Sequence, residues 1–365
     1  MIGGYPGRRS IWYLIREMSS GQNLEARRRS KMMIDVFTHI LPPKYLAERN
    51  KRAGANFTSQ YAKYPLANPG LTDLGIRFRI MDKFKDLVHV LTIAGPNMES
   101  ITRPKDAVEL ARIANDEMAE LVVKYPERFV GAVACLPMND VDAALKEADR
   151  AIQELSFQGV EIFTDINGKP VDSPEFHPLY EKMERYNLPV LLHPRRENFR
   201  ADYPGEKVSK YLVYTNFGWP YETSVAMARL AFSGIFHKYP NLKVLTHHAG
   251  GMIPFFAGRI ELSHDFNRIR MGYQYDPPLQ KPPLDYYRTF YCDTAIQGNT
   301  PALMCAYAFF GVDHMLFATD MPYDDQLGER ATRETIRSVE EMDIPAAEKR
   351  KIFEENARSL FRLRI

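Results

Sequence analysis

The chain has 365 residues, of which 45% are hydrophobic and 26% are charged, and its formal net charge is +2 at pH 7. This balance is typical of a soluble globular protein and gives no sign of a surface that binds polyanions. We therefore expect no nucleic-acid partner. The longest apolar stretch, residues 303–312, is shorter than the roughly 20 residues that a membrane span needs, so no membrane contact is expected.

The cysteines and the N-terminal segment are two further features of the sequence. Cys135, Cys292 and Cys305 show no CxxC spacing, which favours free thiols in a reducing, cytoplasmic compartment. Residues 1–32 hold basic clusters around a short apolar island, residues 11–15, which is too short for the core of a signal peptide. We expect a disordered or loosely docked extension over 1–32 and a single domain over 33–365.

Short β-branched runs alternate with longer amphipathic segments along this domain, a pattern typical of a parallel sheet covered by helices. Eight segments are predicted strands: Met33–Phe37, Val88–Ile93, Phe129–Leu136, Gly159–Phe163, Pro189–His193, Lys243–His247, Thr289–Asp293 and Met315–Thr319. Eight strands with no linker between them predict an α/β fold, a (β/α)8 TIM barrel.

Apolar residues recur at helical spacing between these strands. The predicted helices are Pro104–Tyr125, Asn139–Leu155, Ser173–Tyr186, Tyr221–Phe236, Thr300–Phe310, Gly328–Glu341 and Pro345–Phe361. Two stretches rich in proline, at about 42–80 and 264–288, read as irregular insertions. The first is expected to form a lid or specificity loop over the barrel mouth, and the second either such a loop or a dimer contact.

Four ionisable side chains stand at the ends of predicted strands: His39, His193, His248 and Asp320. In a (β/α)8 barrel the C-terminal ends of the strands converge on one face, so such residues can share one metal ion. Each has a plainer explanation as a helix cap or a satisfied core group, but their recurrence after strands one, five, six and eight favours a site.

The local sequence around two of these residues sharpens the assignment. His193 follows four apolar residues and precedes a proline that ends the strand, so its ring is expected at the barrel mouth. His247 and His248 are adjacent, and neighbouring residues of an extended chain point to opposite sides. We therefore expect only one of them to face the mouth, and His248 is chosen because it begins a glycine-rich turn.

Arginine and aromatic residues follow the same strand ends. Arg195 and Arg196 come directly after His193 and are candidates to hold a substrate carboxylate, with solvent-facing arginines as the alternative. Phe217, Trp219 and Tyr221 are candidates to line a pocket for an aromatic acid, with core packing as the alternative for at least one of them.

Several motifs resemble the amidohydrolase superfamily, in the branch that includes aminocarboxymuconate-semialdehyde, resorcylate and carboxyvanillate decarboxylases. The resemblance covers about residues 33–362. It is carried by "IDVFTHILP", "RFVGAVACLP", "GVEIFT", "LPVLLHP", "FYCDTA", "LFATDMPY" and, above all, "GWPYETSVAMARLAFSGIFHKYPNLKVLTHHAGGMIPFFAGRI". It implies that His39, His193 and Asp320 are metal ligands, that His248 transfers a proton beside the metal, and that Arg259 helps to hold a substrate carboxylate.

The chain departs from that pattern at Phe37, where the resemblance implies a ligating histidine or glutamate. Phenylalanine has no donor atom. Three protein ligands still suffice for a catalytic zinc with an open position. The missing donor leaves three alternatives: lower affinity for the metal, a different preferred metal, or no metal binding.

These observations favour a metal-dependent, non-oxidative decarboxylase that acts on a small aromatic or enoic carboxylic acid, with one divalent ion, Zn or Mn, as cofactor. His248 or Asp320 would supply the proton. One alternative is a metal-dependent hydrolase of a lactone, amide or C–C bond. Another is a metal-free barrel that binds a ligand or partner. The resemblance also implies a homodimer.

Overall fold

The computed structural model describes residues 32–54 and 59–365. Of the predicted N-terminal extension only Met32 falls within them, and its side chain is buried. The extension over 1–32 and the single domain over 33–365 stay predictions. Within the described residues, no helix is both long enough and apolar enough to cross a membrane.

Eight strand segments lie where the sequence predicts them, and all of them pair in parallel. They are β1 (Met33–Ile40), β2 (Leu87–Ile93), β3 (Phe129–Ala132) continued by β4 (Ala134–Cys135), β5 (Val160–Phe163), β8 (Val190–His193), β9 (Val244–Thr246), β10 (Tyr291–Asp293) and β11 (Met315–Leu316). A small antiparallel pair, β6 (Asp165–Ile166) and β7 (Lys169–Pro170), is added after β5.

The strands form two sheets, in the orders β1-β2-β3 and β11-β10-β9-β8-β5-β4. Backbone hydrogen bonds link the sheets at both seams. At one seam Val133 N–H bonds to Leu91 O at 2.9 Å. At the other, Val36 N–H bonds to Phe317 O at 3.1 Å and His39 N–H to Met321 O at 2.8 Å. The order around the ring is that of a (β/α)8 barrel, with regular pairing interrupted at these two places.

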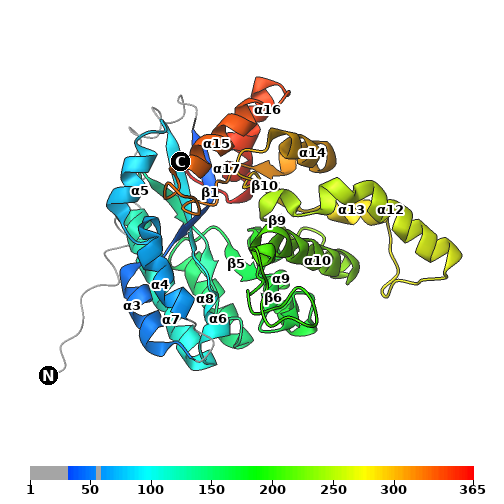
Figure 1. The fold of residues 1–365 in the computed structure, drawn as a ribbon, viewed down its shortest axis with the longest axis horizontal. Coiled ribbons are helices and arrows are strands. Elements are labelled where there is room, and N and C mark those ends of the chain that lie inside the picture. Colours follow the sequence, from blue (N-terminus) through cyan, green and yellow to red (C-terminus); the bar gives the residue numbers. More distant parts are fainter. Residues whose placement is uncertain (1–31, 55–58) are drawn as a thin grey trace.

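Apolar side chains fill the inside of the ring and the layer between strands and helices. The inner cluster takes buried residues from strands around the ring, including Val36, Val90, Leu191, Leu245 and Leu316. A larger cluster packs the outer faces of the strands against the helices. Figure 1 shows the helices surrounding the strands, with the C-terminal helices beside β1.

The helices largely follow the prediction: α7 (Pro104–Lys124), α8 (Val141–Gln153), α9 (His177–Tyr186), α10 (Trp219–Phe232), α11 (Ile235–Lys238), α14 (Thr300–Phe310), α15 (Glu329–Glu340), α16 (Ala346–Arg350) and α17 (Asn356–Leu360). A π-helical turn, residues 351–355, joins the last two. The predicted helix Tyr221–Phe236 is divided because Gly234 takes a positive φ of 83°.

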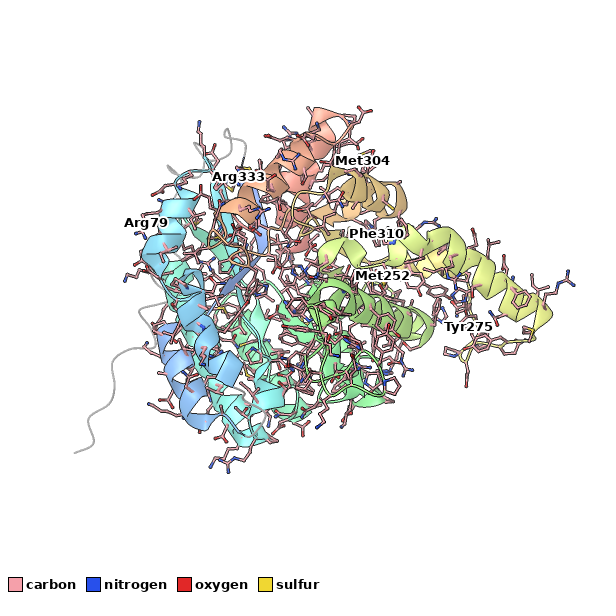
Figure 2. The ribbon with its side chains drawn as sticks, viewed as in Figure 1. Arg79, Met252, Tyr275, Met304, Phe310 and Arg333 are labelled. Atoms are coloured by element: carbon pink, nitrogen blue, oxygen red, sulfur yellow. The ribbon has the colours of Figure 1, made fainter. Side chains whose placement is uncertain are left out.

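The two stretches predicted as irregular contain helices, so that part of the prediction is wrong. The first holds α3 (Pro43–Arg52), α4 (Ser59–Ala67) and α5 (Leu74–Met81), and a short helix, α6 (Met98–Ile101), follows β2. In the second, α12 (Ile253–Arg270) runs through residue 264 and α13 (Pro283–Tyr287) follows. Figure 1 shows α12 projecting away from the strands. Figure 2 places Met252 at the base of this arm and Tyr275 in the loop that returns from it.

Candidate metal centre and active site

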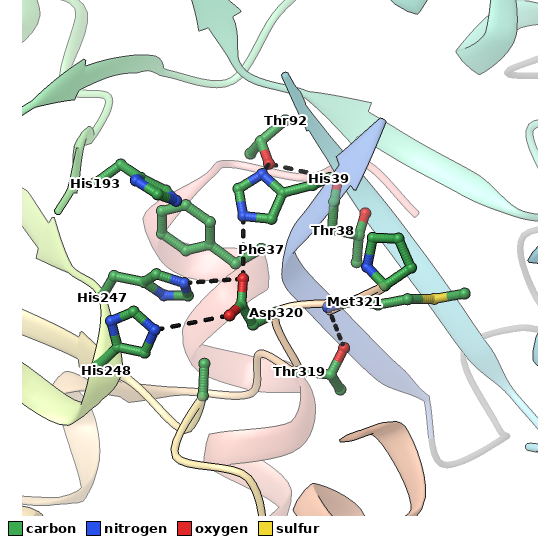
Figure 3. Close-up of polar contacts among 12 residues, drawn as sticks. Phe37, Thr38, His39, Thr92, His193, His247, His248, Thr319, Asp320 and Met321 are labelled. Atoms are coloured by element: carbon green, nitrogen blue, oxygen red, sulfur yellow. Dashed lines mark hydrogen bonds and ion pairs between the residues drawn. The ribbon is translucent and has the colours of Figure 1, made fainter. Parts of the chain in front are cut away.

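Three histidines and one aspartate from four strand ends meet at the mouth of the barrel. They are His39 at the end of β1, His193 at the end of β8, His247 just after β9, and Asp320, four residues after β11. The Nε2 atoms of His39 and His247 each lie 3.2 Å from Oδ1 of Asp320. Nε2 of His248 lies 3.7 Å from the other carboxylate oxygen. Figure 3 shows these rings directed toward the carboxylate.

Two sets of side chains among the described residues bring three donor atoms within 4.8 Å of one another: His39, His193 and His247, and His247, His248 and Asp320. The predicted trio of His39, His193 and Asp320 is therefore brought to one place but is divided between the two sets. His247 belongs to both. It was not among the predicted ligands, yet it lies at the centre of the cluster.

The expectation that only one of the adjacent histidines faces the mouth was wrong for a backbone reason. His247 is extended, with φ −81° and ψ 158°, but His248 and Ala249 take positive φ values of 57° and 54°. This left-handed turn breaks the alternation of an extended chain and brings both imidazoles to Asp320. Such a conformation costs about 1–2 kcal/mol for each non-glycine residue. Asp320 itself has a φ of 61°, so the site is built on strained backbone.

The protein fixes the far nitrogen, Nδ1, of each of the three clustered histidines. Nδ1 of His39 lies 3.1 Å from the Thr92 hydroxyl and 3.3 Å from Ile93 O. Nδ1 of His193 lies 2.7 Å from Pro194 O. Nδ1 of His247 forms a short contact with Oδ2 of Asp293. Backbone carbonyls and carboxylates at Nδ1 leave Nε2 free to bind a metal, which is the usual arrangement around metal-ligating histidines.

The donor atoms also fit a divalent ion by distance. Nε2 of His39 and Nε2 of His247 are buried and have no hydrogen-bond partner. Both approach one carboxylate oxygen at 3.2 Å without hydrogen-bond geometry. With metal bonds of about 2.0–2.1 Å, neighbouring donors in a tetrahedral zinc site stand about 3.3 Å apart. Imidazole nitrogens with a carboxylate oxygen are a donor set that suits zinc and manganese.

Burial and the neighbouring charges set the protonation of the cluster. Burial opposes a charge on His247, but the carboxylates of Asp293 and Asp320 outweigh it and raise the pKa of this imidazole to about 10. Burial alone would raise the pKa of Asp320, yet the histidines around it lower that pKa well below its usual range. Burial together with His39 and His247 lowers the pKa of His193, which therefore stays neutral.

Phe37 packs inside this cluster without offering a donor. Its side chain is fully buried, and its ring stacks on that of His247 with centroids 4.1 Å apart and an interplanar angle of 25°. The rings of His39 and His193 lie 5.8 and 6.0 Å from it. The apolar ring therefore lies among the three histidines (Figure 3).

A cavity of about 160 Å³ opens beside the cluster, and His193 belongs to both. Aromatic side chains form much of its wall: Tyr64, Phe163, Tyr214, Trp219 and Tyr323. The partly buried ring of Tyr323 lies 5.2 Å from that of His39 and 6.0 Å from that of Tyr64. A flat, conjugated molecule with a carboxylate would find ring faces on its sides and the cluster at its end.

Arg195 and Arg196, the candidates to hold a substrate carboxylate, both line the cavity. Arg195 also pairs with Glu197 at 3.2 Å and with Asp165 at 3.4 Å. The guanidinium of Arg196 donates to Glu222 at 2.9 Å, and the Trp219 indole N–H donates to the carbonyl of Arg196 at 3.2 Å. Both arginines are therefore held in place before any substrate arrives.

The remaining predicted residues lie elsewhere. Arg259 is on the exposed side of α12 and is not among the residues that line the cavity, because this helix projects from the barrel. Phe217 and Tyr221 are exposed and do not line the cavity either, whereas Trp219 does. Asp293, which the sequence analysis did not assign, is fully buried behind His247. Its place at the end of a predicted strand was the signal that could have found it.

Comparison with known proteins places this architecture. The amidohydrolase family model matches residues 34–363. The chain belongs to the amidohydrolase family. It is 28% identical over 323 residues to 2-amino-3-carboxymuconate-6-semialdehyde decarboxylase of Dictyostelium discoideum, covering 85% of this chain and 86% of that one. It is 31% identical over 296 residues to gamma-resorcylate decarboxylase of a Polaromonas species, covering 79% and 86%.

Solved amidohydrolase structures agree with this decarboxylase branch. The 2,6-dihydroxybenzoate decarboxylase bound to 2,6-dihydroxybenzoate superposes with a TM-score of 0.74 at 26% identity, covering 92% of this chain and 100% of that one. The 5-carboxyvanillate decarboxylase of Sphingomonas paucimobilis gives a TM-score of 0.76 at 26% identity, with the same coverage. The Polaromonas dihydroxybenzoic acid decarboxylase, solved with manganese and 2-nitroresorcinol, gives 0.74 at 28%, covering 91% and 97%.

Proposed function

We propose that this amidohydrolase is a metal-dependent, non-oxidative decarboxylase of a small aromatic or enoic carboxylic acid. The observation that carries the proposal is His193, whose ring belongs both to the donor cluster and to the wall of an aromatic, arginine-bearing cavity. A substrate in that cavity would present its carboxylate to the cluster. The decarboxylases among the relatives support the reaction class.

His39, His193 and Asp320 would hold the metal, as the sequence predicted, and manganese or zinc would suit them. When bound, a divalent ion orients a substrate carboxylate and withdraws negative charge that develops during the reaction. Side chains around the ion bind and orient the rest of the substrate. Arg195 and Arg196 would donate hydrogen bonds to a second oxygen of the substrate. The rings of Phe163 and Trp219 would pack against the flat substrate and exclude water.

The reaction replaces a carboxylate on carbon with a proton and releases carbon dioxide. Asp320 faces His39 and His247 with one oxygen and His248 with the other, and these histidines lower its pKa well below the usual range, so the carboxylate carries no proton to give. His248 stands at the edge of the cluster, is partly exposed, and lies 6.4 Å from the ring of Trp219 on the cavity wall. We therefore assign the proton transfer to His248, with Asp320 keeping its ring oriented.

The test is a screen of hydroxybenzoates and muconate-type acids with protein loaded with Mn²⁺ or Zn²⁺, following carbon dioxide release. Reactions run in ¹⁸O-labelled water separate the alternatives. Carbon dioxide release without label in the organic product supports the decarboxylase. Label in the product without carbon dioxide release would assign the hydrolase of a lactone, amide or C–C bond instead. A matched control is the His193→Ala variant, which should release none.

The exposed side of α12 supports a homodimer. Phe255, Leu262, Phe266 and Ile269 are all more than half exposed and share one stripe at helical spacing. A stripe of large apolar residues on a projecting helix is the kind of surface that a second copy covers. Light scattering should give a dimer, and Leu262→Glu with Phe266→Glu should give a monomer. Lys105→Glu, on the exposed side of α7, should leave the dimer intact.

We also propose that the enzyme is cytoplasmic and that its partner is a small molecule. The three cysteines are free, which suits a reducing cytoplasm. The near-neutral formal charge of +2 suits a small-molecule substrate better than a nucleic acid.

A further inference from the structure

We propose that His247, from the sixth barrel strand, is itself a metal ligand beside His39 of the first strand, where Phe37 offers no second donor, and that Asp293 holds His247 in the tautomer that ligation requires. The inference rests on the proposed metal dependence of the protein. It adds one residue to the coordination sphere and one positioning residue behind it. Neither was expected from the sequence.

His247 lies among the donor atoms of the cluster. His247 is the residue common to both donor sets of the described chain. Its Nε2 is fully buried, has no hydrogen-bond partner, and lies 3.2 Å from the same Asp320 oxygen that His39 approaches at 3.2 Å. Each of these nitrogens therefore lies as far from the carboxylate oxygen as two neighbouring ligands of one ion lie from each other, for which about 3.3 Å is expected.

Phe37 contacts His247 but offers the cluster no donor atom. The ring of Phe37 lies within 6.0 Å of three histidine rings. A donor at position 37 would reach the cluster, but phenylalanine offers none. Its ring instead stacks on His247 at 4.1 Å, which fixes the plane of that imidazole. The side chain that removes one donor thus orients another.

The two carboxylate oxygens of Asp293 face different groups. Oδ1 accepts from the backbone N–H groups of Ala249 and Ala295 at 3.2 and 3.0 Å. Oδ2 faces Nδ1 of His247. A carboxylate at this place accepts a hydrogen bond from Nδ1–H, so the proton that a metal would displace from the imidazole is the one on Nε2, and the form that remains is the tautomer of a metal-ligating histidine.

This arrangement makes Asp293→Asn a precise test. The amide oxygen has to stay on the two backbone N–H groups, since an NH₂ group there would face two donors. The NH₂ group then faces Nδ1 of His247, which must accept its hydrogen bond. The proton moves to Nε2 and removes the lone pair that would bind the metal. Shape and volume are almost unchanged, so a purely structural role for Asp293 would leave metal affinity close to that of the wild type.

The experiment is a Mn²⁺ titration of the full-length protein after dialysis against EDTA, with free Mn²⁺ followed by electron paramagnetic resonance. His247→Asn should weaken binding by at least about a hundredfold, and Asp293→Asn by about tenfold to a hundredfold or more. The double variant should bind no more weakly than His247→Asn alone, because both changes remove the same ligand. His264→Asn, on α12 and outside the cluster, is the matched control and should bind like the wild type.

Wild-type affinity in His247→Asn, within about threefold, would overturn the inference, as would a wild-type protein that binds neither Mn²⁺ nor Zn²⁺. If His247→Asn proves unfolded by circular dichroism, the Co²⁺-loaded wild type decides. Its proton NMR spectrum should show three exchangeable imidazole N–H signals shifted by the metal, from His39, His193 and His247, and two would overturn the inference. Tight binding without carbon dioxide release would refute the proposed reaction and leave this ligand assignment standing.

Discussion

The raised pKa of His247 makes the stability of the metal-free protein depend on alkaline pH. The imidazole has an ordinary pKa of 6.5 and one of about 10 in the folded chain, where Asp293 and Asp320 outweigh the effect of burial. The folded state therefore binds a proton that the unfolded state has lost. This contribution is present in full below about pH 6.5 and disappears as the pH rises through about 10.

Each pH unit inside that window is worth about 1.4 kcal/mol of unfolding free energy. Two buried thiols, Cys135 and Cys292, also have raised pKa values because of burial, and they add a loss of the same sign above about pH 8.5. His247→Asn keeps both thiols and lacks the imidazole. Between pH 8.5 and 9.5 the wild type should therefore lose about 1.4 kcal/mol more than this variant.

Urea denaturation at pH 8.5, 9.0 and 9.5, in EDTA, measures the difference. Midpoints and slopes for both proteins give unfolding free energies at each pH. If the two proteins lose stability in parallel, His247 carries no extra proton in the folded state, and the charge arrangement described for the cluster is refuted.

Four further substitutions follow from the site. His193→Ala should remove bound metal and turnover together, as measured by metal analysis and carbon dioxide release; either one surviving in full would reject its role. His248→Ala should keep the metal but lower turnover by on the order of a hundredfold or more, and full activity would exclude it as the proton-transfer group. Arg196→Ala should raise KM by about tenfold or more through loss of a charge-assisted hydrogen bond, so an unchanged KM counts against substrate contact. Phe37→Ala should lower the unfolding free energy of EDTA-treated protein by about 3–5 kcal/mol, whereas a loss below about 1 kcal/mol would mean that its ring is not part of a packed core.

The fold was predictable because each barrel strand is a short apolar run with a clear boundary. The positions of His39, His193 and Asp320 followed from the same boundaries, since parallel strands deliver their C-terminal residues to one face. The structure brings all three to one cluster, and Arg195, Arg196 and Trp219 to the adjoining cavity.

His247 was missed because its recruitment depends on backbone that the pattern of residues does not reveal. The left-handed φ of His248 is held by the turn around it and reverses the alternation on which the prediction relied. The helices of the first insertion were missed for a different reason. They are short, and α4 contains Pro65, so neither periodicity nor composition distinguishes them from a loop. In α12, apolar residues on the exposed side obscure the helical pattern.

The most direct test is a crystal soaked in Mn²⁺ and measured at a wavelength where manganese scatters anomalously. A single strong anomalous peak is predicted about 2.0–2.3 Å from Nε2 of His39, His193 and His247 and from a carboxylate oxygen of Asp320. Crystals that show no peak at this cluster, or a peak only at some other place on the protein, would contradict the account.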